Sequence, residues 1–216
     1  MLLELTPDEL LSTTRSVRKR LDLERPVERS VVEECIQLAL QAPTGSNAQG
    51  WHWVVVEDAA KKAALAEMYA RHFDPYLAMG DELQLYGDDD TRTARQEAVS
   101  SSARYLRDHF AEVPVLVIPC LWGRLPEVSD TFSQASFWGS LLPAVWSFML
   151  AARARGMGSA WTTLHLPSER EAADLLGIPF DRVTQAGLFP LAYTVGTDFR
   201  SAPRLPLDDV LHWDAW

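Results

Sequence analysis

The segment APTGSNAQGW, residues 42–51, joins a predicted helix to a predicted strand. Residues 31–41 before it carry apolar side chains at positions 31, 32, 35, 36, 38, 39 and 40, a spacing typical of a buried helix. The apolar run WHWVVV after it, residues 51–56, is typical of a strand. Pro43 lacks the N–H that a continuing helix needs, and Gly45 can adopt backbone angles that other residues avoid. We therefore expect a helix, a turn and a strand in that order.

The side chains of this loop are polar and uncharged. Thr44 and Ser46 supply hydroxyls, and Asn47 and Gln49 supply carboxamides. This set suits the edge of a flat, neutral ligand with many acceptors better than it suits a phosphate or a metal. The same residues are also common in turns, where they bond to nearby backbone groups. The loop by itself leaves both interpretations open.

A second polar cluster lies near the N-terminus, in the stretch TRSVRKR, residues 14–20. Arg15 and Arg18 can face one ligand, with the hydroxyl of Ser16 between them. Two guanidinium groups and a hydroxyl suit a phosphate monoester, which offers several acceptor oxygens. The alternative is a solvated basic stretch that is balanced by Asp22 and Glu24.

Size and composition limit the protein class. The 216 residues carry a net charge of −10 and read as a single domain, 1–216. With no long basic run, nucleic acid is not an expected partner. Cys35 and Cys120 suggest neither a disulfide framework nor a metal site. No secretory signal appears, and the apolar run 141–152 is too short for a membrane span, so we expect a cytoplasmic protein with no membrane partner.

The remaining pattern alternates helices and strands. The stretch Thr6-Pro7-Asp8-Glu9 predicts a capped helix start. A helix capped by Asp58 follows the first strand, and residues 73–110 read as an irregular, variable helical lid. A long helix over 136–155, apolar on most sides, must be buried by the core or by a second subunit. The other expected elements are strands at 113–122, 158–164 and 186–195, and a helix at 168–176 ended by Gly177.

Several motifs of enzyme chemistry are missing. The sequence has no Gly-x-Gly-x-x-Gly after a strand, no phosphate loop ending in Gly-Lys-Ser/Thr, no His-Glu-x-x-His and no Gly-x-Ser-x-Gly. The five histidines lack ligand spacing, so we assign no metal. If the protein is an enzyme, a bound cofactor is expected to carry the chemistry.

Taken together, separated stretches resemble the nitroreductase family of FMN-dependent oxidoreductases. They are RSVR at 15–18, APTGSNAQGW at 42–51, GMGSAWTT at 156–163 and RLPL at 204–207. The resemblance implies an α+β fold with a central mixed β-sheet flanked by helices, in an intertwined homodimer that holds two FMN molecules. Thr14 stands where many relatives carry another arginine, and Gly50 stands where many have proline.

The resemblance also assigns residues to the cofactor. Arg15, Ser16, Arg18 and Arg204 would hold the FMN phosphate, with Arg200 as a secondary candidate. The flavin ring would meet the remaining cofactor residues, with the loop reaching across from the partner subunit: Pro43, Thr44, Ser46, Asn47, Gln49, Trp161, Thr162 and Thr163. Flavin N5 would carry the chemistry, so no catalytic side chain is assigned. Pocket-wall candidates are Tyr69, Phe73, Tyr76, Trp122 and Phe132.

The implied activity is ping-pong hydride transfer from NADH or NADPH, through flavin N5, to a nitroaromatic, quinone or activated-alkene acceptor. Two alternatives stay open at this level. One is a flavin-binding or flavin-processing protein without nicotinamide turnover, and the other is a dimeric scaffold without a cofactor.

Overall fold

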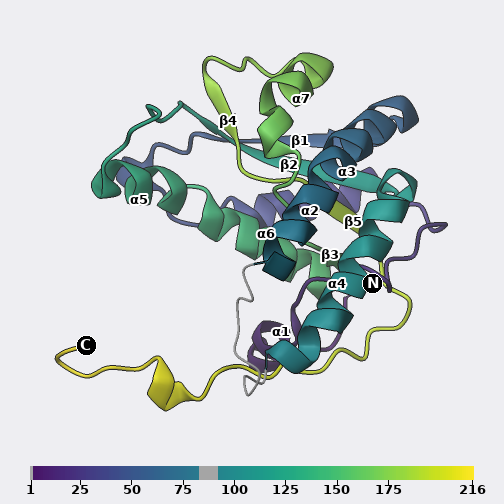
Figure 1. Cartoon of the computed structure of the whole chain (residues 1–216), viewed down its shortest axis with the longest axis vertical. Helices are drawn as coiled ribbons and strands as arrows, with labels where there is room; N and C mark the ends of the chain where they lie inside the picture. Colours follow the sequence, from purple (N-terminus) through teal and green to yellow (C-terminus); the bar gives the residue numbers. More distant parts are fainter. Residues whose placement is uncertain (1, 83–91) are drawn as a thin grey trace.

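The structure is a computed structural model that describes residues 2–82 and 92–216 (Figure 1). The helices are α1 (Pro7–Thr13), α2 (Arg29–Ala39), α3 (Ala59–Glu82), α4 (Thr93–His109), α5 (Thr131–Gly139), α6 (Leu142–Ala154) and α7 (Glu169–Leu176). The strands are β1 (Trp51–Val56), β2 (Val115–Trp122), β3 (Met157–Ser159), β4 (Val183–Gln185) and β5 (Phe189–Tyr193). Short 3₁₀ turns occupy Gly45–Asn47, Phe110–Glu112, Leu166–Ser168 and Leu207–Asp209.

The strands form one sheet in the order β1-β2-β5-β3, and β4 also pairs with β2. Strand β2 is central, because β1 pairs along one edge of it while β4 and β5 pair with its two ends on the other edge. Among the described residues, all ladders between these strands are antiparallel, and the parallel pairing is the isolated bridge of Ser16 with Ser159. The family resemblance implies a mixed sheet, with both parallel and antiparallel pairs. In the described strands the ladders are antiparallel, and parallel pairing is confined to that isolated bridge.

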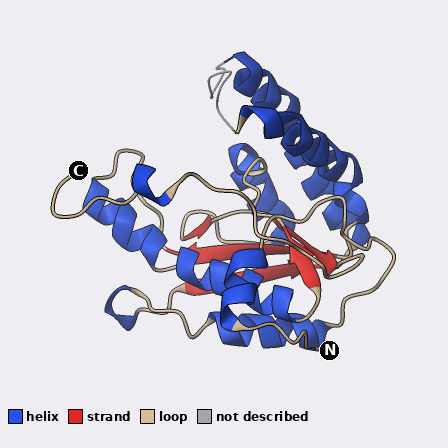
Figure 2. Cartoon of the chain, turned by 90° about the horizontal axis from the view of Figure 1, so that it is seen from below, coloured by secondary structure: helices blue, strands red, loops and turns tan. Residues whose placement is uncertain are grey.

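Helices cover both faces of this sheet, as Figure 2 shows. Alternate side chains of β2 point to opposite faces. Leu116, Ile118 and Cys120 pack with α3, α4 and α7, whereas Val115 and Val117 pack with α2 and α6. A strand that is buried on both faces must be apolar at every position, which explains its unbroken apolar sequence. The predicted α+β architecture with a helix-flanked central sheet is confirmed.

Local signals place several elements well. Strand β1 has the predicted bounds, and α7 ends at Gly177, which adopts the left-handed conformation with φ 71°. Helix α1 begins with a capping box, in which the backbone N–H of Thr6 donates to Glu9 Oε2 at 2.8 Å and that of Glu9 donates to Thr6 Oγ1 at 3.2 Å. Asp58 Oδ1 accepts from the Lys61 N–H at 2.9 Å at the start of α3.

The predicted long helix over 136–155 is wrong in one respect, because it is two helices that break at Ser140 and Leu141. Pro143 causes the break: it has no N–H for the carbonyl of Gly139, and its ring collides with that group. The 24 residues Thr131–Ala154 are apolar and long enough to cross a membrane by composition. However, α6 packs in the core against α2 and β3. Only 39% of the most apolar 18-residue stretch within Thr131–Ala154 is buried, so this broken helix also presents apolar surface.

Two other predictions need correction or remain partial. The strand predicted for 158–164 is limited to β3, and beyond it Thr162 makes only an isolated bridge with Leu188. Helices α3 and α4 confirm that 73–82 and 93–109 are helical, and residues 83–91 of the predicted lid lie outside the described residues.

The C-terminal segment leaves the body of the molecule, as Figure 1 shows at the yellow end of the chain. Residues 203–216 are all exposed, and the relative solvent-accessible areas of Trp213 and Trp216 are 79% and 102% of the reference value for a free residue. Exposure of large apolar side chains to water is unfavourable, so the tail carries a surface suited to packing against another protein surface.

Candidate functional site

A cationic cavity of about 530 Å³ opens beside the stretch 15–20. Its lining comes from three separated parts of the chain: Arg15, Ser16, Val17, Arg18, Lys19, Arg20, Arg95, Ala98, Val99, Ser102 and Phe199. The structure therefore brings the three predicted phosphate residues Arg15, Ser16 and Arg18 into one cavity. It adds a wall from α4 and a residue from the segment after β5.

The backbone of the 15–20 stretch lies directly against strand β3 of the sheet. The Val17 N–H donates to the Ser159 carbonyl at 2.9 Å. Gly158 permits this approach, because a Cβ at that position would lie 2.8 Å from Val17 Cβ and 2.8 Å from Thr194 Cγ2. The predicted motifs 15–18 and 156–163 thus meet in space, although about 140 residues separate them in the sequence.

The two arginines of the motif have different surroundings. Arg15 is exposed, and its Nη1 donates to the Arg200 carbonyl at 3.3 Å, which fixes it to the segment after β5. Arg18 is half-buried, and its Nη1 donates to Ser102 Oγ on α4 at 3.2 Å. Burial lowers the pKa of Arg18, and arginine nevertheless keeps its charge in proteins. A charge held away from water attracts an anion more strongly.

The cavity lining contains five cationic side chains and no acidic one among the described residues. Arg20 is paired, since its Nη2 lies 2.6 Å from Asp198 Oδ1. The other four, Arg15, Arg18, Lys19 and Arg95, have no carboxylate partner in residues 2–82 and 92–216. In a chain with a net charge of −10, this concentration of positive charge indicates an anion-binding site.

The loop at 43–49 does not line this cavity, and its backbone is unusual. Ser46, Asn47 and Gln49 have φ of 51°, 52° and 49°, in the left-handed region that favours glycine. Such conformations cost free energy and persist where the surrounding structure requires them, often at functional sites. Within the loop, the Gln49 N–H donates to Thr44 Oγ1 at 3.1 Å and Gln49 Nε2 donates to Asn47 Oδ1 at 3.0 Å.

The loop is anchored at one end and open elsewhere. The Gly45 N–H donates to Ser140 Oγ at 3.0 Å, which ties the loop to the break between α5 and α6. Pro43, Ser46, Asn47 and Gln49 are exposed, and Thr44 is half-buried. A strained loop that presents hydroxyl and amide groups to solvent suits contact with a ligand or with a second protein chain.

Residues 161–163 divide between core and surface. Trp161 is half-buried, with its ring 5.2 Å from that of Phe189. The buried hydroxyl of Thr162 donates to the Leu188 carbonyl, and the Leu188 N–H donates back to the Thr162 carbonyl. Thr163 is exposed. The side chain of Thr162 is thus committed to the fold, and Thr163 is the hydroxyl of this stretch that is open to a ligand.

Other predicted residues lie apart from the cavity. Arg204 is exposed, and its Nη1 donates to the neighbouring Pro203 carbonyl at 3.3 Å, so it does not join Arg15 and Arg18 within this chain. Tyr69 and Phe73 are 3% and 1% exposed, so these pocket-wall candidates are core residues. The remaining wall candidates are exposed: Tyr76, Trp122 and Phe132.

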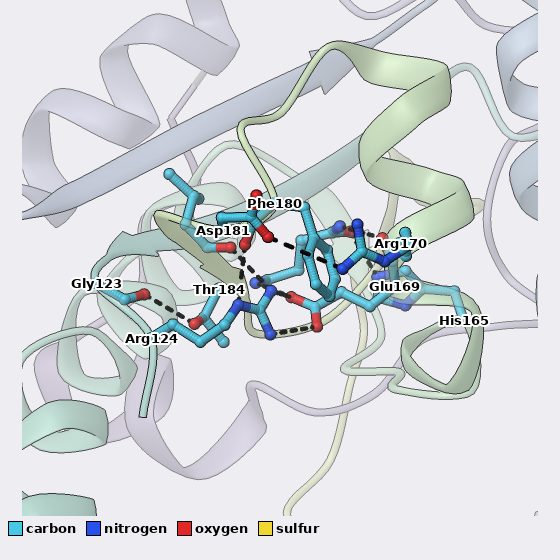
Figure 3. Close-up of polar contacts among 10 residues, drawn as sticks. Gly123, Arg124, His165, Glu169, Arg170, Phe180, Asp181 and Thr184 are labelled. Carbon is cyan, nitrogen blue, oxygen red and sulfur yellow. Dashed lines mark hydrogen bonds and ion pairs between the residues drawn. The ribbon is translucent and has the colours of Figure 1, made fainter. Parts of the chain in front are cut away.

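A polar network of Arg124, Glu169 and Gln185 lies apart from the cavity (Figure 3). Arg124 Nη1 and Nη2 lie 3.0 and 2.8 Å from Glu169 Oε2 and Oε1. The Gln185 N–H donates to Glu169 Oε1 at 2.9 Å, and Gln185 Nε2 donates to the Glu169 carbonyl at 2.9 Å. The Arg124 guanidinium packs over the Phe180 ring, with Cζ of Arg124 3.9 Å from the ring centroid. These contacts join the segment that follows β2 to α7 and β4.

His165 completes the network from the buried side. Its Nε2 lies 3.2 Å from Gln185 Oε1, and because the Gln185 amide nitrogen already donates elsewhere, Nε2 is the donor. His165 is fully buried and its Nδ1 has no protein partner among the described residues. Burial lowers the pKa of His165 to about 4, so the ring is neutral at neutral pH.

Sequence reasoning missed the contribution of α4 and of Phe199. The signal in α4 is the spacing of Arg95, Ala98, Val99 and Ser102, at i, i+3, i+4 and i+7, which places them on one helix face. Nothing in the sequence indicates that this face turns toward residues 15–20. That juxtaposition depends on the packing of α3 and α4 over the sheet.

The fold and the cavity define an α+β protein with a cationic cavity whose lining suits a phosphate-bearing or similarly anionic ligand. The Nitroreductase family model matches residues 11–196, and the chain belongs to this family. The family predicted from the sequence is confirmed, and the protein is an oxidoreductase of that family.

Known relatives cover nearly the whole chain. The NADH dehydrogenase of Thermus thermophilus is 29% identical over 214 residues, spanning 92% of this chain and 91% of the relative. Iodotyrosine deiodinase, in a structure with FMN and 3-iodo-L-tyrosine, has a TM-score of 0.70 at 20% identity and covers 97% of this chain and 99% of its own. The FMN and NADPH-dependent nitroreductase NfnB of Sphigopyxis sp. strain HMH has a TM-score of 0.67 at 20% identity, covering 98% and 100%. The two structural likenesses establish the shared fold.

Proposed function

We propose that this protein is an FMN-dependent NAD(P)H oxidoreductase that works as a homodimer and reduces nitroaromatic, quinone or activated-alkene acceptors. The observation that carries the proposal is the cationic cavity, which collects, in an acidic protein, four cations that have no carboxylate partner within the described part of the chain. Two of the named relatives support the choice of cofactor and donor, since one was solved with FMN and another is described as FMN and NADPH-dependent.

The residues of the cavity fit the phosphate end of FMN. Arg15 and Arg18 supply charge and Ser16 supplies a hydroxyl, while the Arg18 guanidinium is already oriented by Ser102. A dianionic phosphate matches two guanidinium groups, and bidentate contacts would fix its orientation. Arg200 contributes its carbonyl to Arg15, so its assigned role is to position that arginine.

The neutral loop fits the ring of the same cofactor. Hydroxyl and amide groups of Thr44, Ser46, Asn47 and Gln49 match the carbonyls and ring nitrogens of a flavin. Thr163 and the backbone of 161–163 would approach from the other side. When bound, FMN would supply the redox chemistry, a ping-pong hydride transfer from NAD(P)H to the acceptor. The chain itself would bind the flavin, orient the reactants over it and exclude water.

The homodimer explains the exposed features of the single chain. The 43–49 loop is open to solvent, the broken helix α5–α6 presents apolar surface, and the tail carries exposed leucine and tryptophan side chains. We propose that a second copy covers these surfaces and that the loop of one subunit meets the flavin held by the other. Arg204, in the projecting tail, would then serve the partner's phosphate site.

The visible absorption spectrum of the purified protein tests the cofactor, because bound flavin is yellow. Anaerobic mixing with NADH and with NADPH then tests the activity. We expect the flavin absorbance to bleach with at least one donor and to return when an acceptor is added. A yellow protein that neither donor bleaches would favour a flavin-binding role without nicotinamide turnover. A protein that stays colourless after reconstitution with FMN would contradict the cofactor assignment.

A further inference from the structure

The cavity holds more positive charge than one phosphate monoester requires. Such a phosphate carries about −1.5 to −2 charges near neutral pH. Arg15 and Arg18, with Ser16, can match that charge. Lys19 and Arg95 remain, and Lys19 Nζ already donates to Ser101 Oγ on α4 at 2.8 Å. Arg95 is exposed and is the surplus cation that faces the cavity from α4.

Arg95 lies well away from the point where Arg18 meets α4. Ser102, which accepts the hydrogen bond from Arg18, is seven residues further along the helix. At 1.5 Å per residue, the two positions are about 10 Å apart along the helix axis. They lie on the same face, so Arg95 extends the cavity wall in one direction from the phosphate residues. The backbone of Arg95 thus stands about two helical turns from the point where the phosphate residues meet α4.

The wall between these two positions is apolar. Ala98 and Val99 line the cavity there, and Val99 is 47% exposed. A volume of about 530 Å³ lies within the range of small-molecule sites, which is about 300–1,000 Å³. The cavity therefore combines an anion site at one end, an apolar wall in the middle and, at the other end, a guanidinium with no carboxylate partner among the residues that the structure describes.

Building on the proposed oxidoreductase function, we infer that Arg95 binds an anionic group on a reactant and favours a reactant that carries this group over a matched reactant that lacks it. A guanidinium recognises carboxylate and phosphate groups by paired hydrogen bonds, so either group fits. The anion can come from the donor, as the 2′-phosphate that distinguishes NADPH from NADH, or from the acceptor, as a carboxylate. Both sources place the same chemistry at the same residue.

The Arg95→Gln variant tests this assignment against two matched pairs of reactants. The donors are NADPH and NADH, and the acceptors are 4-nitrobenzoate and 4-nitrobenzamide, which differ by one negative charge. We expect kcat/KM to fall about tenfold for the member of one pair that carries the extra anionic group (NADPH or 4-nitrobenzoate), the effect of one hydrogen bond to a charged group. The member that lacks this group (NADH or 4-nitrobenzamide) should stay within about twofold on the same reasoning. The affected pair identifies whether the donor or the acceptor carries the anion.

Arg104→Gln is the matched control, because Arg104 is also exposed on α4 but does not line the cavity. It removes the same charge from the same helix and should leave all four values unchanged. Arg95→Lys should restore part of the preference, since the charge returns without the paired donors.

Equilibrium binding gives a readout that does not depend on turnover. Calorimetric titration of the protein as purified should show weaker binding of NADP⁺ or of 4-nitrobenzoate to Arg95→Gln, with NAD⁺ and 4-nitrobenzamide unchanged. Equal losses for all ligands, or no loss for any, would overturn the inference. Reduced retention of FMN in Arg95→Gln would instead assign Arg95 to the cofactor phosphate. A wild-type protein that binds no FMN defeats the proposed function, while the binding titration still decides the role of Arg95.

Discussion

Replacing Glu169 with alanine should destabilise the protein because it leaves Arg124 without its carboxylate. The pair is bidentate at 2.8 and 3.0 Å, and the two side chains are only 28% and 16% exposed. The same carboxylate also accepts the backbone N–H of Gln185. Losing one partner of a fully buried pair costs about 3–5 kcal/mol, and the partial exposure here reduces the expected loss to about 3 kcal/mol.

Glu171→Ala provides a closely matched control. Glu171 also lies in the first turn of α7 and also makes a bidentate pair, with Arg71 at 2.7 and 3.2 Å. That pair is exposed, at 46% and 50%, so solvent screens it and its loss should cost much less than the loss of the Arg124 pair. Both substitutions remove a negative charge from the same helix N-terminus, so effects on the helix dipole largely cancel.

Urea unfolding followed by tryptophan fluorescence measures the difference between the two variants. Protein concentration and flavin loading must be equal, because ligand and partner binding both shift apparent stability. A Glu169→Ala variant that loses no more stability than Glu171→Ala would refute the claim that the Arg124 network stabilises the fold.

Three further predictions concern the cofactor site, acid stability and backbone packing. Arg18→Ala should weaken FMN retention by about 1.5–3 kcal/mol, the scale of a hydrogen bond to a charged group, and unchanged affinity in a flavin titration would remove Arg18 from the site. Burial lowers the pKa of His165 from 6.5 to about 4, so between these values the unfolded chain binds a proton that the folded chain does not. Stability should therefore fall by about 3 kcal/mol as the pH drops from 6.5 to 4, and His165→Gln should lose this part of the slope in urea unfolding at several pH values. Gly158→Ala should cost about 1–3 kcal/mol in unfolding free energy through its contact with Val17, whereas Gly139→Ala, with nothing within 4 Å of the added carbon, should not destabilise.

The sequence predicts the local elements where their signals are local. The bounds of β1, the capping box of α1 and the end of α7 at Gly177 all follow from residues within a few positions of each other. It predicts less well where neighbouring segments compete. The break between α5 and α6 depends on Pro143, whose effect on the preceding turn outweighs the apolar pattern that continues through it.

The candidate site divides in the same way. The residue types of the 14–20 stretch and of the 43–49 loop indicate an anion and a neutral ring before any coordinates are known. Their spatial relation does not follow from residue types. Arg204 lies apart from Arg15 and Arg18 in a single chain, and the loop lies outside the cavity.

The sequence by itself determined the family, the helix-flanked sheet and the chemistry of the segment 42–51, because ordered motifs and periodic apolar positions are written in the chain. Only the tertiary structure showed that the loop backbone is strained, that α4 supplies Arg95 and Ser102 to the cationic cavity, and that His165 is buried. These features arise from contacts between residues far apart in sequence. Side-chain burial and backbone angles at such contacts are set by packing, and no local pattern records them.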